Sequence, residues 1–520
     1  MDEKQKVTHA ATQIAAATSI SRVLGFVRDI LLANMFGATG MTDAFFIAYR
    51  VPNFFRELFA EGSISAAFVP VFTESLSKNG QEDAKKLYAS VAAFLLAFLF
   101  VISVLGIWLS PYIVQVIAPG FVSDSAKYAL TVTLTRVMIP FLFFVSVAAL
   151  LKGVLNSLRS FFIPATAPIF LNISIITSAL FFAPLFTEPF LAIGLAVSVG
   201  GALQVLIQVP AMVKKGYMVA PSFKSPHPGL KKIYRLLMPT IAGMGVAQIN
   251  ILISTVIVSY LASGAATYLY YAMRLLHLPI GIFGVAIATA ILPSLSGFAA
   301  EGDIENLRGT FSFSLRLLFF ITLPAMAGLI VFADPIIHVL LQRGEFTAVA
   351  TSETAYALIF YSYGMWAFVG ARVLASTFHS MQDTKTPVKA AAVSIITNIV
   401  FSLLLMGPLK HGGLALANSI AAAVNFIILY ILLRKKIGRI DGKKIMFSAG
   451  KIVFASIMMA GAGKVVLNMF MWQQAASSIV KGSILALVIG FCIGLYVLIM
   501  YIFKSEELQY LLKMKRKKQA

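Results

Sequence analysis

Long apolar stretches recur along this chain, and they constrain its fold more than any other feature. A helix needs about 20 predominantly apolar residues to cross a bilayer, and fourteen candidate stretches lie between polar breaks. They do not alternate between apolar and polar residues, so a β-barrel is not expected. The candidate helices cover residues 8–35, 41–75, 88–110, 128–151, 163–183, 190–212, 233–261, 265–297, 313–333, 353–379, 387–407, 412–433, 447–470 and 482–503.

Composition agrees with this interpretation. Hydrophobic residues make up 59% of the 520 residues and charged residues only 12%, whereas soluble domains average about half apolar and a quarter charged. These values argue against a soluble enzyme. The sequence therefore predicts an all-α polytopic membrane protein.

The basic residues predict how the chain is oriented. Lys and Arg number 42 against 21 acidic residues. If the N-terminus is cytoplasmic, 29 of the 42 fall in cytoplasmic segments and about five in outer segments such as that of Lys127. Because cytoplasmic loops carry the excess of Lys and Arg, we expect both termini inside. The net charge of +21 then needs no nucleic-acid partner.

Two further absences narrow the class of protein. Cys492 is the single cysteine, so an intrachain disulfide and a cysteine-based metal cluster are excluded. The first apolar stretch contains Arg22 and Arg28, which the apolar core of a signal peptide would not tolerate, so we expect no cleavable signal peptide.

The sequence contains an internal duplication. Five short segments recur in order at offsets of 219 to 224 residues: 45–51 with 269–275, 67–70 with 290–293, Pro164 with Pro387, 174–178 with 394–398, and 194–196 with 413–415. Each repeat covers six predicted helices, so both halves enter the membrane from the same side, as in parallel-repeat transporters. We predict an N-terminal lobe over 1–216, a C-terminal lobe over 217–438, and two extra helices with a basic tail over 439–520. This arrangement favours a site between the lobes and alternating access.

Several arginines lie inside the predicted helices. Each would cost roughly 2.5–3.5 kcal/mol if it faced lipid at mid-depth, so we expect a water-filled cavity for Arg28, Arg56 and Arg274. A structural ion pair between Arg22 and Asp29, seven residues apart, stays an alternative, as does snorkelling of Arg50 and Arg136. Asn53, Glu57 and Glu61 step by four along one helix face.

The arginines indicate the charge of the ligand. Guanidinium groups bind phosphate and carboxylate oxygens and stay charged at working pH, so the cavity predicts an anionic substrate such as a phosphate or pyrophosphate. Residues 461–464 lack P-loop spacing, and the six His show no metal-binding spacing. Transport must then use an ion gradient or the membrane potential.

The residues also carry a family resemblance. Residues 21–29, 36–46, 52–56, 60–62, 270–275 and 382–387 resemble the MurJ/MviN family, the proposed lipid II flippases of bacterial cell-wall synthesis. The resemblance covers the whole chain. It implies the fold of the multidrug/oligosaccharidyl-lipid/polysaccharide exporters and transport of an undecaprenyl-pyrophosphate-linked precursor to the outer leaflet of the inner membrane. It also implies that helices thirteen and fourteen form a groove for the lipid tail.

The resemblance places the functional residues. Substrate-binding arginines fall on Arg22, Arg28, Arg56 and Arg274, and we assign cavity support to Ser21, Asp29, Asp43, Glu57 and Asn172. Met273 departs from the expected polar neighbour of Arg274, so how that arginine is held stays open. We expect no cofactor, and coupling to Na⁺ or H⁺ stays undecided. Asp383 and Pro387 suit a helix start, which we favour over a gating role.

We therefore predict a non-enzymatic, monomeric lipid II flippase that binds membrane lipids and no nucleic acid, with association to wall-synthesis proteins left open. One alternative is a flippase for another polyprenyl-linked polysaccharide, or a drug antiporter of the same superfamily. A second alternative is a scaffold of the wall-synthesis machinery that transports nothing.

Overall fold

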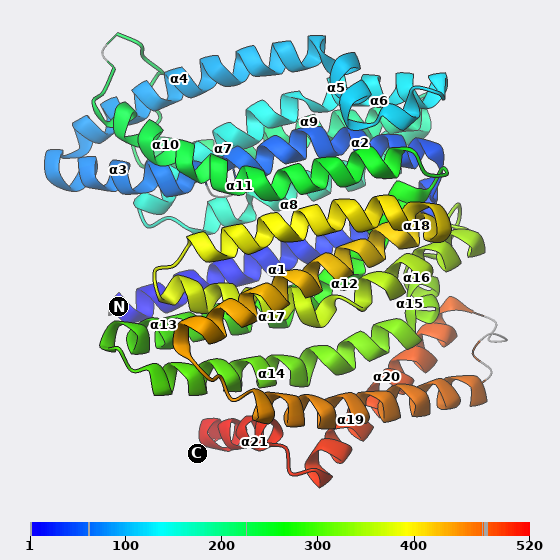
Figure 1. Ribbon diagram of the computed structural model, residues 1–520. Coiled ribbons are helices and arrows are strands. Elements are labelled where there is room, and N and C mark those ends of the chain that lie inside the picture. Colours follow the sequence, from blue (N-terminus) through cyan, green and yellow to red (C-terminus); the bar gives the residue numbers. More distant parts are fainter. Residues whose placement is uncertain (1–2, 61–62, 225, 471, 473–476, 520) are drawn as a thin grey trace. The chain divides into compact units, whose positions relative to one another are not determined.

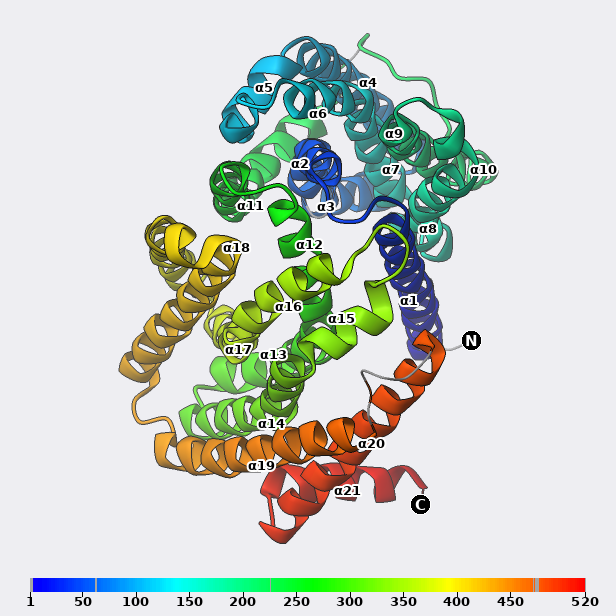
Figure 2. The same ribbon diagram turned by 90° about the vertical axis from the view of Figure 1, so that its right-hand side faces the viewer.

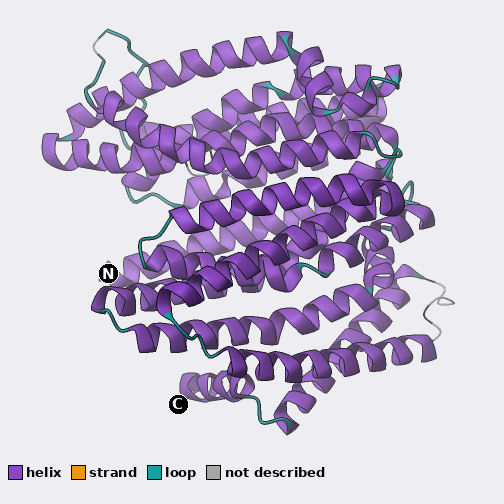
Figure 3. Cartoon of the chain, in the orientation of Figure 1, coloured by secondary structure: helices purple, strands orange, loops and turns teal. Residues whose placement is uncertain are grey.

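The structure is a computed structural model that describes residues 3–60, 63–224, 226–470, 472 and 477–519. Every regular element among these residues is helical (Figure 3), which confirms the all-α prediction. The chain divides into two compact units, residues 1–266 and 267–520, and each is described by itself. The predicted domains came from the sequence repeat, which a division by packing does not test, so they stay a prediction.

The first unit holds the elements up to α11 (Figure 1): α1 (Glu3–Phe36), α2 (Gly40–Phe55), η1 (Arg56–Ala60), α3 (Ser63–Asn79), α4 (Gln81–Trp108), α5 (Ser110–Ile117), η2 (Pro119–Phe121), α6 (Ser125–Met138), α7 (Pro140–Ser157), α8 (Phe162–Thr177), η3 (Ser178–Phe182), η4 (Ala183–Leu185), α9 (Pro189–Leu206), α10 (Val209–Lys214) and α11 (Gly229–Ser259). Within it α1 packs along α8 (Figure 2), and α11 packs against α3 and α4.

The second unit begins inside α12: α12 (Ala265–Pro279), η5 (Ile280–Gly284), α13 (Val285–Glu301), α14 (Ile304–Val331), α15 (Ala333–Leu341), α16 (Ala348–Ser362), α17 (Met365–Ser380), α18 (Lys385–Ile437), α19 (Gly442–Met469), α20 (Ser478–Ile502) and α21 (Glu506–Gln519). α19 packs against α14 and α20. The long helix α18 contains both predicted spans 387–407 and 412–433, and the non-helical backbone of Lys410 separates them.

The helices have the length and composition of membrane spans. Among the described residues, eight helices are long and apolar enough to cross a bilayer, and the pair α16 and α17, bent by 41°, makes a ninth. α18 accounts for two of the predicted spans, and the remaining four predicted spans lie on α1, on α2 with α3, on α11, and on α12 with α13. The fourteen-span prediction is consistent with this arrangement.

Local structure repeats between the two halves of the chain. A proline interrupts α2 at Pro52 and ends α12 at Pro279, and a π-helical turn follows each, η1 and η5. Proline removes a backbone donor, which explains why the α-helical ladder is locally replaced. Arg159 (φ 57°) lies between α7 and α8, and Gln382 (φ 58°) lies between α17 and α18. Both residues have a left-handed backbone conformation, and they are 223 residues apart. These correspondences support the duplication predicted from the sequence.

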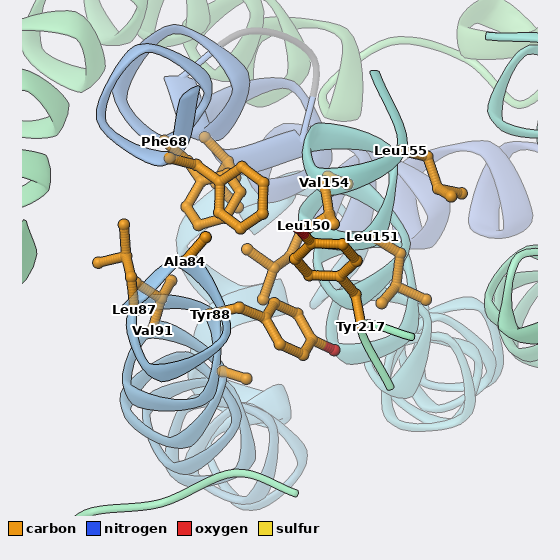
Figure 4. Close-up of a cluster of buried hydrophobic side chains, with 14 of the residues drawn as sticks. Phe68, Ala84, Leu87, Tyr88, Val91, Leu150, Leu151, Val154, Leu155 and Tyr217 are labelled. Carbon is orange, nitrogen blue, oxygen red and sulfur yellow. The ribbon is translucent and has the colours of Figure 1, made fainter. Parts of the chain in front are cut away.

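An apolar cluster holds α3, α4 and α7 together (Figure 4). Phe68 of α3, Leu87 of α4 and Val154 of α7 are buried members of this cluster, as is Phe72 of α3. Tyr217, from the segment after α10, packs on Phe72 with 5.8 Å between ring centroids. This cluster fixes α3, the next described helix after the π-helical turn η1.

Candidate functional site

Arg28 is the centre of one group of predicted site residues. Its Nε and Nη2 atoms donate to Asp29 Oδ1 at 3.0 and 2.6 Å, and Nη1 donates to Asn172 Oδ1 at 3.2 Å. The Asn172 Nδ2 atom donates to the carbonyl oxygen of Ser21 at 3.1 Å. We call Ser21, Arg28, Asp29 and Asn172 the α1–α8 cluster. Arg28 and Asp29 are both buried, so dissolved ions weaken the attraction between their charges much less than they would at the surface.

The α1–α8 cluster follows from helix geometry. Ser21 and Arg28 are seven residues apart and therefore lie near one face of α1, and α8 packs along α1. Asn172 bridges the two positions from α8. The ion pair described for Asp29 is with its neighbour Arg28, while Arg22 is exposed and has no side-chain ion pair among the described residues. The predicted role of Arg22 in binding stays a prediction.

Arg56 is the centre of a second group, at the π-helical turn. Its Nε atom donates to Asn53 Oδ1 at 2.8 Å, and Nη2 lies 3.8 Å from Glu57 Oε1. Asn53 Nδ2 donates to the same Glu57 oxygen at 3.0 Å, and Gln248 of α11 donates to the other. We call Asn53, Arg56, Glu57 and Gln248 the π-turn cluster. Two members of the predicted polar stripe thus meet here, whereas Glu61 lies outside the described residues.

Asp43 occupies the other end of α2. Arg56 is thirteen positions further along the chain, which corresponds to about 20 Å along a helix axis. Its Oδ2 atom accepts a hydrogen bond from the Gly264 backbone at 2.7 Å and lies 3.3 Å from Lys127 Nζ. Both side chains are buried, and Lys127 Nζ is 3.9 Å from the Phe121 ring centroid. Sequence reasoning assigned Lys127 to an outer segment and missed this pair.

Arg274 lies on α12 in the second unit and is half-buried. Its meeting with Arg28 and Arg56 in one chamber stays a prediction. The second unit also contains a buried arginine near the start of the predicted helix 313–333, which was counted among the 29 basic residues of the cytoplasmic side. Arg316 of α14 donates to Glu506 at 2.9 Å and to Glu507 at 2.8 Å, which ties α21 to α14.

Metal binding has no visible support in the described part of the chain. There, no three His, Cys, Asp or Glu side chains gather as a metal ion would require. The polar residue Asn250 lies on α11 and is half-buried. Coupling to Na⁺ or H⁺ stays undecided.

Comparison with known proteins decides the family. The model of a family described as lipid II flippase MurJ matches residues 32–484. A probable lipid II flippase MurJ of Vibrio cholerae is 36% identical over 457 residues, covering 86% of this chain and 87% of that protein. A lipid II flippase MurJ of Burkholderia cenocepacia is 37% identical over 432 residues, covering 82% and 84%. The chain belongs to the MurJ family.

Solved structures agree with the MurJ assignment. A lipid II flippase MurJ in an inward closed conformation superposes with a TM-score of 0.79 at 26% identity, covering 94% of this chain and 98% of that one. An inward-facing multidrug transporter of the MATE family gives a TM-score of 0.67 at 15% identity, which shows a shared fold alone. As a member of the MurJ family, the chain is a multi-pass membrane protein of the bacterial inner membrane and a transporter by class.

Proposed function

We propose that this protein is a lipid II flippase, which moves the undecaprenyl-pyrophosphate-linked peptidoglycan precursor from the inner to the outer leaflet. The observation that carries the proposal is the pair of arginines, Arg28 on α1 and Arg56 at the π-helical turn η1, each held in a polar cluster. Membership of the MurJ family supplies the substrate class. Arg22 of the first unit and Arg274 of the second unit are the other two arginines proposed to bind the diphosphate.

The neighbouring carboxylates explain how such a site operates when empty. Asp29 pairs with Arg28 and Glu57 with Arg56, which lowers the net charge that a substrate-free cavity carries through the membrane. Diphosphate oxygens suit the planar guanidinium fork. Loading then exchanges carboxylate contacts for phosphate contacts. No bond of the substrate is broken, so the cycle is transport without catalysis.

The energy source follows from the sign of the cargo. Moving one negative charge outward through an inside-negative potential of 100 mV releases about 2.3 kcal/mol. An alternating-access cycle with both termini in the cytoplasm uses that field directly, and a monomer suffices for it. An Na⁺ or H⁺ gradient is the other candidate drive.

The polyprenyl tail stays in lipid, along the groove proposed for helices thirteen and fourteen. These are α19 and α20, which pack against each other in the second unit. Their exposed apolar side chains include Phe454, Ile457 and Phe491.

Complementation tests the site and the function together. In a bacterium depleted of its own lipid II flippase, the wild-type chain should restore wall synthesis and prevent lysis. Arg28→Ala, Arg56→Ala and Arg274→Ala should each fail although the protein reaches the membrane, whereas the exposed Arg136→Ala should succeed. Full rescue by all three alanine variants would overturn the site. Failure of the wild-type chain to reduce accumulated lipid II would overturn the function.

A further inference from the structure

Three polar contacts join α2 to α11 and the turn that follows α11. Arg50 donates to Thr255, Gln248 donates to Glu57, and the backbone of Gly264 donates to Asp43. We call these contacts the α2–α11 ladder. In α2 and the π-helical turn the contact residues are 43, 50 and 57, so they are spaced by seven and lie on one helix face.

The ladder shows that the two helices are antiparallel. As the contact residue in α2 moves from 43 to 57, its partner moves from 264 back to 248. Successive contacts are about 10.5 Å apart along α2, two helical turns. The contacts therefore run along the length of α2, from the Asp43 end to Arg56.

The position of α11 makes the ladder informative. In the sequence repeat, α11 corresponds to the first helix of the second half, yet it packs with the first unit, against α3 and α4. The second unit begins at residue 267, eight positions after the end of α11 and inside α12. A helix in this place is suited to report events in the first unit to the chain that follows.

Gln248 connects α11 to the proposed diphosphate grip. Its side chain is buried, and its amide donates to the carboxylate of Glu57, whose other oxygen accepts from Asn53 and lies near Arg56. Because an anion at Arg56 competes with Glu57 for the same guanidinium, loading must alter the carboxylate that Gln248 holds.

We propose that Gln248 is a positioning residue for substrate capture: through Glu57 it sets the orientation of Arg56, and it makes the packing of α11 on α2 depend on whether an anion occupies Arg56. The inference rests on the proposed function for the identity of the natural anion, but the coupling itself concerns diphosphate chemistry. Thr255 and Gly264 keep α11 in register with α2 while the Gln248 contact changes.

A matched glutamine separates positioning from ordinary packing. Gln208 is also buried in the first unit, but its amide donates to the backbone carbonyls of Ala148 and Gln204. Gln248→Leu and Gln208→Leu remove the same amide from buried sites. Only the first removes a contact with Glu57.

Hydrogen exchange of the purified full-length chain tests the coupling, with inorganic pyrophosphate as the probe and chloride at equal ionic strength as its control. In the wild type and in Gln208→Leu, pyrophosphate should accelerate exchange of the α11 amides around residues 248–259 on the order of ten-fold, the effect of one lost hydrogen bond to a charged group. Gln248→Leu and Arg56→Ala should show no acceleration.

The inference is overturned if pyrophosphate leaves α11 exchange unchanged in the wild type, or changes it equally in Gln248→Leu. A second readout is the lipid II concentration that gives half-maximal transport in vesicles, which should rise on the order of ten-fold in Gln248→Leu and stay unchanged in Gln208→Leu. If pyrophosphate alters exchange but the wild type moves no lipid II, the coupling stands and the proposed substrate falls.

Discussion

The Asn172 side chain on α8 accepts a hydrogen bond from the Arg28 guanidinium on α1, with 3.2 Å between Oδ1 and Nη1. Its amide group simultaneously donates to the Ser21 carbonyl at 3.1 Å. One side chain therefore fixes both the orientation of Arg28 and the packing of α1 on α8. Asp29 holds the opposite side of the same guanidinium.

Asn172→Leu should weaken transport by removing this orientation. A hydrogen bond to a charged group contributes about 1.5–3 kcal/mol, so we expect at least a ten-fold loss of lipid II transport in vesicles. Asn79→Ala provides the control. Asn79 is exposed, and its side chain donates a hydrogen bond to Asp83, which is not a proposed binding residue. Equal transport in both variants would show that Asn172 does not orient Arg28.

The buried pair of Asp43 and Lys127 should dominate stability at its end of the first unit. Lys127→Met leaves a buried carboxylate without its cation, which costs about 3–5 kcal/mol. Thermal unfolding in detergent should show a large loss of stability for Lys127→Met alone. The loss of stability should be smaller for the Asp43→Asn, Lys127→Met double variant. A double variant less stable than the single variant would contradict this account.

Arg316 should control how α21 is attached to α14. It contacts Glu506 and buried Glu507, and Glu507 also accepts from Ser448 at 2.9 Å. Arg316 holds the pKa of Glu506 below its usual range through a hydrogen bond. Arg316→Met should therefore release α21, which limited trypsin digestion at Lys513 would detect as faster cleavage. Unchanged cleavage would mean that the charge network is dispensable.

Asp383 should stabilise the second unit throughout the neutral range. Lys436, at 2.7 Å, and the Thr386 backbone and hydroxyl hold the pKa of Asp383 well below its usual range. A lowered pKa in the folded state gives stability that is complete above the unfolded pKa of about 3.9 and is lost as pH falls through the lower folded value.

The melting-temperature difference between wild type and Asp383→Asn should therefore be constant between about pH 6 and pH 8. It should shrink only under strongly acid conditions. A difference that disappears near neutral pH would contradict the assigned pKa shift. Thr386→Val removes one of the hydrogen bonds that lower the pKa of Asp383, so it should lower stability at neutral pH and reduce the part of the stability that is lost in acid.

Much of the fold was predictable because membrane helices leave long apolar runs in the sequence. The π-helical turns that follow Pro52 and Pro279 were not predicted, since one extra residue per turn leaves no compositional trace. Helix spacing correctly related Ser21 to Arg28. The Asp383 interaction with the Thr386 backbone agrees with the favoured helix-start role.

Contacts between distant segments were not predictable in this way. Lys127 was assigned to an outer segment and Arg316 to the cytoplasmic end of a predicted helix, because nothing local marks a lysine or arginine whose acidic partner lies 84 or 191 residues away. The partner of Glu57 was hidden for the same reason, since Gln248 follows 191 residues later. Helix periodicity gives the face on which a residue lies, but packing alone gives its partner.

The most direct test of the account follows labelled lipid II in vesicles that contain only this protein. With the wild type, lipid II should change leaflet, and an inside-negative potential should speed its outward movement. Arg28→Ala, Arg56→Ala and Arg274→Ala should each abolish the movement, while Arg136→Ala should retain it. Movement that persists in all three alanine variants would contradict a diphosphate grip built from these arginines.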